Sequence, residues 1–537
     1  MRSLRKLFSE YRAARAHDLS VPSLREVRAE AKEARARSGG LRRRDLLAGA
    51  GAGALALGLP RAARAKTQPE IAIVGGGIAG LACALALTDK NVSPTVYEAS
   101  GRIGGRMFTN YDYFDGQVAE WGGELVDSGH KSLIQLCKRF NLPLDGVVAA
   151  EPSGSEDTYK FFGTYYPRAQ AEIDFEPVYD AVIDDVGDAP FPTLYNDFTA
   201  AGEILDEMSV YDWIETRVPG GHSSPMGQLL DAAYVIEYGG DSEEQSALNL
   251  IYLLAYQPTP NTFLMFGESD EAYHIAGGNQ QLPQAIANHL GVGSTVKLGH
   301  SLVKIKKTPA GRYELTFQCG GSTFVKTVDY AVLCLPFAVL RELDYAQAGF
   351  DLLKIQAIQE LGRSDNAKTQ LQFATRFWNQ PGAWPGISNG ACYSDTGLQS
   401  SWEVSRAQPG TMGVLNGYTG GAVTRALTAT TPFGTVQNNK VAQDVATTLA
   451  RMQDVFPGAA AQYTGKAIQS IPKKSPFYKL SYSFYKPGQY TSFCGYEGAR
   501  QDGVLFAGEH TSVDFQGYMN GGSETGQRAA KELLFLI

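Results

Sequence analysis

The first clear pattern in the chain is a short apolar run that ends in a cluster of glycines. The β-branched run 71–74 is followed by Gly-x-Gly-x-x-Gly at Gly75, Gly77 and Gly80, and an alanine-rich apolar stretch then continues to Leu87. A short apolar run bounded by glycine is typical of a buried strand, and the longer run is typical of a helix. A second short run, 94–97, ends at Glu98. The pattern predicts a strand–turn–helix–strand unit, which is the start of an α/β fold with a parallel sheet.

Each glycine of the turn has a physical role if a dinucleotide binds there. Gly75 makes the tight turn, Gly77 lets the backbone approach a pyrophosphate, and Gly80 lets helix and strand pack closely. The helix then points its unpaired N–H groups at the phosphates. Glu98 lies eighteen residues after Gly80, near the spacing of about 20 expected for a carboxylate that binds ribose hydroxyls. The unit predicts a bound adenine dinucleotide, NAD or FAD, and the alternative is a purely structural glycine-rich turn.

Further stretches carry the pattern of regular elements. We expect helices at 130–140 and 282–290, and strands at 295–305 and 329–336. Alternating apolar residues from 366 onward predict a strand with Lys368 at its start, and 503–508 predict a strand followed by a loop and a C-terminal helix. The long segment from about 150 to 270 is rich in Asp, Pro and Tyr and has no nucleotide motif, so we expect it to begin a second domain.

Length and charge narrow the function classes. At 537 residues the chain exceeds the roughly 250–300 residues that one core usually serves, so two domains are expected. The net charge of −8 argues against nucleic acid as a partner. Residues 1–65 hold 15 Lys+Arg and 6 Asp+Glu, a net +9, and the remainder carries −17. An acidic body is compatible with cationic substrates. Six scattered cysteines without C-x-x-C spacing predict no metal site and no disulfide framework.

The N-terminal 65 residues have the pattern of an export signal. A basic segment with Arg43 and Arg44 precedes an apolar run to Leu59, and Ala63-Arg64-Ala65 resembles a cleavage site. The paired arginines are typical of a twin-arginine signal with a long basic n-region, which predicts a periplasmic or secreted protein. The apolar run is too short to span a bilayer stably, so we expect no membrane span; the alternatives are a membrane anchor or an amphipathic helix. Residues 1–41 have no assigned role.

Four motifs resemble the flavin-containing amine oxidase family. They are the loop Gly101–Arg106, the run Trp121–Glu124, Phe506-Ala507-Gly508-Glu509, and Gln516–Gly522. The resemblance covers about 69–145, 270–380 and 475–537. It implies a Rossmann-like FAD-binding domain (69–150, 270–345 and 495–537) with an inserted α+β substrate-binding domain (151–269 and 346–494), and it selects FAD over NAD.

The resemblance also implies roles for single residues. The expected cofactor-binding residues are Gly75, Gly77, Ile78, Ala79, Gly80, Glu98, Arg106, Gly122, Gly123, Glu124, Leu302, Gly508, Glu509, Gly517, Tyr518 and Met519. Arg106 is expected to pair with the pyrophosphate, and Leu302 lies where the family has its adenine-contacting strand. Lys368 is expected to hold a water against the flavin ring, and Tyr482 and Tyr518 to flank the amine nitrogen. The alternatives are a solvated lysine at a strand end and tyrosines that only pack.

The chain departs from the family pattern at several positions. Ser100 replaces an arginine found in many members, and Pro472 replaces a tryptophan near the substrate. The mammalian monoamine oxidases bind flavin through a cysteine just before the position of Tyr482. Leu480 and Ser481 stand there in this chain, so the resemblance implies non-covalent FAD.

The substrate prediction depends on one position and one charge. L-amino-acid oxidases that resemble this chain place an arginine where it has Leu125, and a neighbouring acidic Glu124 would repel a substrate carboxylate. We therefore expect oxidative deamination of a primary amine or diamine, with oxygen reduced to hydrogen peroxide. The alternative is an L-amino-acid oxidase that gives a 2-oxo acid, ammonia and hydrogen peroxide. A non-amine flavoprotein such as a desaturase is the third reading. The electron acceptor is left open between oxygen and a periplasmic electron carrier. The oligomeric state is also left open, with a homodimer as one possibility.

Overall fold

A five-stranded parallel sheet carries the glycine turn. The computed structural model describes residues 68–258 and 262–537, so the predicted export signal at 1–65 lies outside the described residues. The strand order is β23-β13-β1-β2-β9, and each neighbouring pair is parallel. The strands are β1 (Ile71–Val74), β2 (Thr95–Tyr97), β9 (Val296–Lys297), β13 (Tyr330–Leu333) and β23 (Val504–Phe506). The predicted strand–turn–helix–strand unit is confirmed, and all of β1 is buried.

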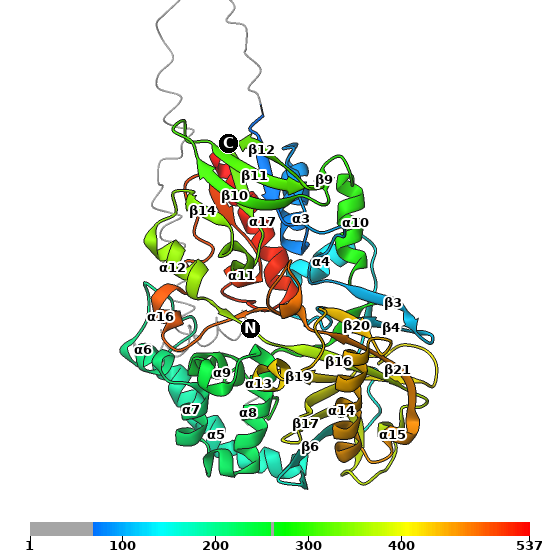
Figure 1. The fold of residues 1–537 in the computed structure, drawn as a ribbon. Helices are drawn as coiled ribbons and strands as arrows, with labels where there is room; N and C mark the ends of the chain where they lie inside the picture. Colours follow the sequence, from blue (N-terminus) through cyan, green and yellow to red (C-terminus); the bar gives the residue numbers. More distant parts are fainter. Residues whose placement is uncertain (1–67, 259–261) are drawn as a thin grey trace, which may run out of the picture. The chain divides into compact units, whose positions relative to one another are not determined.

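Two helices from opposite ends of the described chain pack together beside this sheet. α3 (Ile78–Thr88) follows the glycine turn, and α17 (Met519–Leu536) ends the chain; Figure 1 shows them side by side. A Cβ on Gly526 would lie 2.1 Å from the carbonyl oxygen of Ala79, so only glycine permits this approach. α10 (Gln281–Leu290) packs on α3 and α4 (Lys131–Arg139) on α17, which confirms both predicted helices. The C-terminal motif is thereby brought beside the first glycine turn.

A second sheet of four strands follows in the order β12-β11-β10-β14. Its strands are β10 (Ser301–Lys307), β11 (Tyr313–Cys319), β12 (Ser322–Val328) and β14 (Asp344–Gln347). The continuous strand predicted at 295–305 is wrong, because the chain bends between β9 and β10 and Gly299 adopts a positive φ of 70°. Leu302 lies in β10 opposite Phe317, and its side chain is buried in the core.

An eight-stranded sheet holds the predicted strand with Lys368. Its order is β20-β21-β16-β19-β18-β17-β6-β7, and only the β17–β6 pair is parallel. The strands are β6 (Ser155–Phe161), β7 (Thr164–Tyr166), β16 (Ala367–Phe373), β17 (Ile387–Ser394), β18 (Gln399–Glu403), β19 (Gly413–Thr419), β20 (Phe433–Thr435) and β21 (Tyr463–Ser470). The amphipathic α14 (Asn439–Val455) packs on β16 and β21. Lys368 is the second residue of β16 and pairs in register with Tyr418 of β19.

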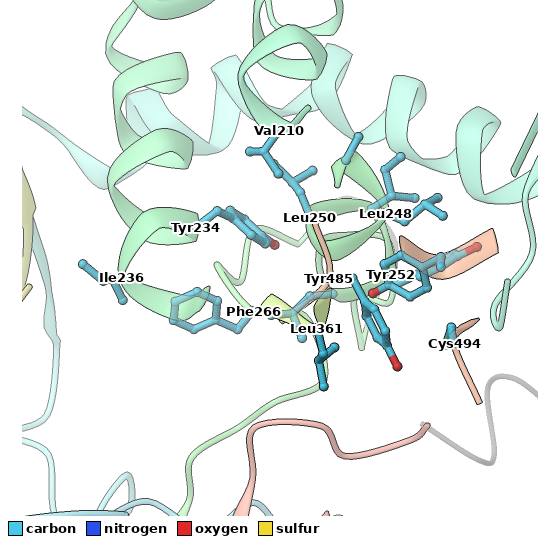
Figure 2. Packing of buried hydrophobic residues seen from close by; sticks show 14 of the residues in the cluster. Val210, Tyr234, Ile236, Leu248, Leu250, Tyr252, Phe266, Leu361, Tyr485 and Cys494 are labelled. Atoms are coloured by element: carbon cyan, nitrogen blue, oxygen red, sulfur yellow. The ribbon is translucent and has the colours of Figure 1, made fainter. Parts of the chain in front are cut away.

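Helices fill the segment that carried no nucleotide motif. They are α5 (Arg168–Asp188), α6 (Ala200–Glu207), α7 (Val210–Arg217), α8 (Pro225–Tyr238) and α9 (Ala247–Leu254). Ser224 caps the start of α8 by accepting from the N–H of Gly227, and Gly239 ends the helix with a positive φ of 65°. Figure 2 shows Tyr234 and Ile236 of α8 in one apolar cluster with side chains of α9 and with Tyr485. This packing fixes the last turn of α8 near the segment that contains Tyr482.

Short elements complete the described chain. They are β3 (Thr109–Phe114), β4 (Gln117–Glu120), β5 (Leu144–Gly146), β8 (Tyr273–Ile275), β15 (Gly362–Arg363), β22 (Ser483–Phe484), α11 (Phe337–Leu340), α12 (Leu352–Glu360), α13 (Gly421–Arg425), α15 (Ala459–Gln462) and α16 (Gln489–Phe493), with single 3₁₀ turns at η1 (Gly221–Ser223), η2 (Ser242–Glu244), η3 (Phe377–Asn379), η4 (Pro472–Lys474) and η5 (Glu509–Thr511). No helix within 68–258 or 262–537 is long and apolar enough to cross a membrane. The five-stranded sheet draws on the predicted FAD-binding segments and the eight-stranded sheet on the predicted substrate-binding segments, while the boundaries themselves stay a prediction.

Candidate functional site

The glycine turn has the geometry that a dinucleotide requires. Gly75 has a φ of 113°, in the region that favours glycine, and its N–H donates to the carbonyl of Tyr97 at 2.8 Å. A Cβ on Gly80 would lie 2.0 Å from the carbonyl oxygen of Gly75. A Cβ on Gly77 would meet only the Cα of Gly105, 4.0 Å away, so space is open at this point. The turn therefore leaves a cradle where a phosphate group can approach the backbone.

Helix α3 begins without a side-chain cap. Gly77 is the N-cap and has no side-chain acceptor, and the first turn contains no acidic residue. The first N–H groups of a helix have no partner within it, so those of Ile78 and Ala79 are available to an anion. This arrangement fits the pyrophosphate of FAD.

Glu98 lies at the end of β2 next to the turn. Its Oε2 accepts from the N–H of Gly76 at 2.7 Å, and its Oε1 accepts from the N–H and hydroxyl of Ser100 at 2.8 and 2.6 Å. The carboxylate is thus fixed beside the cradle, in the place expected for a ribose contact. Ser100, which departs from the family pattern, orients this carboxylate.

Arg106 and Glu509 form an ion pair that joins distant segments. Arg106 Nη1 lies 2.9 Å from Glu509 Oε1 and donates to the carbonyl of Ser481 at 2.8 Å. Glu509 Oε2 accepts from the hydroxyl of Ser483 at 2.8 Å and from the N–H of Gly517 at 2.9 Å. Burial alone would raise the pKa of Glu509, but the charge of Arg106 holds it below its ordinary value. The guanidinium predicted to face the pyrophosphate therefore shares its charge with Glu509.

The loop at Gly122–Glu124 packs against the start of α17. A Cβ on Gly123 would lie 2.9 Å from the side chain of Met519. The Asn279 amide donates to the carbonyls of Gly123 and Glu124 at 2.9 and 2.7 Å and so fixes the loop. The side chain of Leu302 is buried in the hydrophobic core and does not face the loop. Any contact between Leu302 and adenine would therefore come from its backbone.

Lys368 forms an ion pair with Glu124, the acidic residue on which the substrate prediction depends. Lys368 Nζ lies 2.6 Å from Glu124 Oε2, and the Trp402 indole N–H donates to Glu124 Oε1 at 3.0 Å. Burial would raise the pKa of Glu124, but the lysine prevails and holds it below its ordinary value. Glu124, the residue expected to repel a substrate carboxylate, is thus paired with Lys368, and its effect on substrate choice stays a prediction.

Tyr482 and Tyr518 are brought together as predicted. Tyr482 Oη lies 3.0 Å from Tyr418 Oη and donates to the carbonyl of Ile236 at 3.1 Å. Tyr518 Oη donates to Glu237 Oε1 at 3.2 Å. A Cβ on Gly517 would lie 3.7 Å from the Tyr482 ring, so the two tyrosines are neighbours. Lys368 joins the same group, since its register partner is Tyr418.

Several residues around the tyrosines were not found from the sequence. The His130 ring lies edge-on to the Tyr518 ring with centroids 5.1 Å apart, and burial lowers its pKa to about 4, so it packs as a neutral imidazole. Ser269 Oγ lies 3.3 Å from Tyr518 Oη and donates to Asp127 at 2.8 Å. Glu237 was missed as well, and the signal that could have found it is a charged residue near the end of the mostly apolar helix α8.

The surroundings of the tyrosines are acidic. Burial raises the pKa of Glu237 to about 7 and that of Asp127 to about 6. Burial and three neighbouring carboxylates (Glu237, Asp127 and Glu124) raise the pKa of Glu271 well above its ordinary value. Negative charge in such a place is stabilised by a cation, so this neighbourhood favours a positively charged ligand.

Replacing Gly80 with alanine is expected to impair cofactor binding. The new Cβ would overlap the Gly75 carbonyl, and overpacking of this kind costs about 1–3 kcal/mol through backbone shifts. The ratio of flavin to protein absorbance in purified protein measures the effect, and Gly80→Ala should lower it. Gly187→Ala in α5 is the control, because no atom lies within 4 Å of its added Cβ and the helix lies outside the predicted FAD-binding segments. Equal FAD content in both variants would contradict the assigned role of the turn.

Most of the chain is similar to known amine and amino-acid oxidases. An L-amino-acid oxidase of Pseudechis australis is 22% identical over 497 residues, which cover 88% of this chain and 87% of the relative. The structure of cyclohexylamine oxidase from Brevibacterium oxydans matches with a TM-score of 0.72 at 21% identity, over 87% of this chain and 99% of that one. Putrescine oxidase bound to putrescine matches with a TM-score of 0.70 at 19% identity, over 87% and 99%.

The family assignment rests on a match along nearly the entire described chain. The model of the flavin containing amine oxidoreductase family matches residues 78–534. The glycine cradle, the uncapped start of α3 and the placement of Glu98 fit the FAD that this family contains. Non-covalent attachment stays a prediction, with Ser481 at the linking position and Cys494 buried. The chain belongs to the flavin-containing amine oxidoreductase family, and it is an FAD-dependent enzyme.

Proposed function

We propose that the enzyme oxidises a primary amine or a diamine to an imine, which water hydrolyses to an aldehyde and ammonia, while oxygen is reduced to hydrogen peroxide. Bound FAD supplies the acceptor for the two electrons and the hydrogen that leave the substrate carbon. The observation that carries the proposal is the pair Tyr482 and Tyr518, with the carboxylate of Glu237 at its hydroxyl end.

The two tyrosines orient the amine in this proposal. Aromatic faces attract a cationic or electron-poor nitrogen by about 0.5–2 kcal/mol. Their hydroxyls are held by consecutive residues of α8, Ile236 and Glu237. The rings are therefore fixed before the substrate arrives, which reduces the ordering that binding requires.

The charges near the tyrosines favour an amine over an amino acid. Glu237, Asp127 and Glu271 all disfavour a substrate carboxylate, and Leu125 offers no positive charge. The positive charge of Arg406 acts on Glu271, but the Arg406 guanidinium already binds Glu151 and the carbonyl of Asn389. It is therefore not free to bind a substrate carboxylate. Cyclohexylamine and putrescine oxidases share the fold. L-amino-acid oxidation is the second candidate function, because a relative that is 22% identical is named an L-amino-acid oxidase.

A substrate panel tests the choice between the two readings. The holoenzyme is mixed anaerobically with monoamines, diamines and L-amino acids in separate reactions, and the flavin absorbance is followed. We expect bleaching by one or more amines and none by L-amino acids. Bleaching by L-amino acids alone would overturn the proposal in favour of an L-amino-acid oxidase.

We propose further that residues 1–65 direct export by the twin-arginine route. The support is the Arg43-Arg44 pair, the apolar run and the Ala63-Arg64-Ala65 site. A reporter fused after residue 65 should reach the periplasm of a bacterial host, and replacing both arginines with lysine should retain it in the cytoplasm. Equal export of the two fusions would refute the route.

A further inference from the structure

The last turn of α8 touches both tyrosines of the candidate site. The Ile236 carbonyl accepts from Tyr482 Oη at 3.1 Å, and Glu237 Oε1 accepts from Tyr518 Oη at 3.2 Å. The two rings come from segments around 482 and 518, which meet where the Tyr482 ring lies against Gly517. Glu237 is therefore a carboxylate placed at the hydroxyl end of the ring pair.

Glu237 has no cationic partner among the described residues. The described Lys, Arg and His side chains form no ion pair with it, whereas the neighbouring Glu124 is paired with Lys368. The titratable groups that face it, from its own helix and from the elements packed against it, are Asp127, Glu271, Tyr234, Tyr238, Tyr393 and Tyr418, besides Tyr482 and Tyr518. The tyrosines are neutral near pH 7, because burial raises their pKa values above the ordinary one.

Amine oxidation requires a group that removes a proton. An alkylamine has a pKa close to that of lysine, about 10.4, so it arrives as an ammonium ion at neutral pH. Loss of hydride from the neighbouring carbon needs the nitrogen lone pair, which the ammonium ion lacks. An effective proton acceptor has a pKa near the working pH, and burial raises that of Glu237 to about 7.

Resting on the amine oxidation proposed above, we infer that the Glu237 carboxylate receives the proton that the substrate ammonium group loses beside Tyr482 and Tyr518. One N–H bond breaks and one O–H bond forms, so the ion pair becomes a neutral amine next to a neutral carboxylic acid. No oxidant takes part in this step.

The hydrogen bonds around Tyr518 accommodate both states of Glu237. As a carboxylate, Glu237 accepts from Tyr518 Oη. As an acid, it can donate to the same oxygen, and the phenol can then turn its proton toward Ser269 Oγ, 3.3 Å away. Neither state leaves the tyrosine hydroxyl without a partner, which keeps the ring in place through the transfer.

Binding of an amine that cannot react tests the inference without turnover. An amine with no hydrogen on the carbon next to nitrogen is titrated into the holoenzyme between pH 5.5 and 9.5, and its dissociation constant is measured by calorimetry. In the wild type the affinity should fall about tenfold per pH unit below a pKa near 7, because Glu237 becomes protonated there.

Substitutions at two positions of α8 separate the effect of the Glu237 carboxylate from that of a carboxylate elsewhere on the helix. Glu237→Gln should remove the loss of affinity that begins near pH 7, while Asp231→Asn, which changes a carboxylate on the outer part of α8 next to His222, should retain it. Glu237→Asp keeps a carboxylate and should also retain it. An unchanged pH profile in Glu237→Gln, with normal FAD content and thermal midpoint, would overturn the inference.

Anaerobic flavin reduction gives the second measurement. With an oxidisable amine at pH 7, Glu237→Gln should reduce its flavin about 10²-fold more slowly than the wild type, and the rate should recover as the pH approaches the pKa of the amine. Equal rates in the two proteins would refute the role of Glu237 and leave the proposed function intact. Failure of amines both to bind and to bleach the wild-type flavin would overturn the proposed function and this inference together.

Discussion

Lys368→Met should lower the rate of flavin reduction or of reoxidation by about 10²-fold while FAD stays bound. The size follows from the loss of one positioned charged group at a buried reaction site. Lys368 lies in β16 and contacts Glu124 and the Trp402 ring, not the glycine turn or Glu509, so FAD binding should be independent of it. Rapid-mixing absorbance separates the two half-reactions, and the flavin-to-protein ratio reports binding.

Two controls make the result specific. Lys304→Met removes an exposed lysine paired with Asp344 on the four-stranded sheet and should leave both rates unchanged. Glu124→Gln keeps the lysine but removes its partner, so it distinguishes loss of the amine group from loss of the ion pair. Unchanged rates in Lys368→Met would show that Lys368 serves only to neutralise Glu124.

The largest stability loss is expected at a buried lysine that forms no hydrogen bond with Tyr482 or Tyr518 in the described chain. Lys354 of α12 is fully buried, and its Nζ donates to the carbonyls of Tyr496 and Glu497 at 2.7 and 2.6 Å. The Glu497 carboxylate accepts from Tyr485 Oη at 2.7 Å and from the N–H of Gly495 at 2.8 Å. Each charge stabilises the other, although burial lowers the pKa of Lys354 and raises that of Glu497. Removing Lys354 leaves two buried carbonyls without their donor, which costs about 1–3 kcal/mol for each.

Lys354→Met should therefore lower the urea midpoint strongly, because two buried carbonyls lose their donor and the Glu497 carboxylate loses a nearby positive charge. In the double variant with Glu497→Gln the loss should be smaller than the sum of the single losses, since no buried charge is left unpaired. Additive losses would show that the two groups act independently. A matched surface substitution, Lys466→Met, removes an exposed ion pair with Asp115 and should change stability by less than about 1 kcal/mol.

Local chemistry made the cofactor region predictable. Gly75 and Gly80 stand where a side chain would clash with the backbone, Gly77 leaves the space for a phosphate open, and Glu98 lies at the end of a strand that the apolar pattern identifies. The family motifs then linked the two ends of the chain, and α3 and α17 do pack together.

The contacts around Lys368 and the two tyrosines could not be predicted from the sequence, because they depend on sheet register and helix packing. The pairing of Lys368 with Glu124 depends on how β16 lies against a loop from residue 124, and no local pattern encodes that distance. Tyr418 and Trp402 reach the site because β18 and β19 are neighbours in the eight-stranded sheet. Glu237 lies in a segment without motifs, and the tertiary packing of α8 brings it to Tyr518.

Anaerobic titration of the holoenzyme with one amine shows whether the protein oxidises amines. If the enzyme is an amine oxidase, one equivalent of a substrate amine bleaches the oxidised flavin absorbance, and readmitted air restores it with one equivalent of hydrogen peroxide. A flavin that stays oxidised with every amine tested, although FAD is fully bound, would contradict the account.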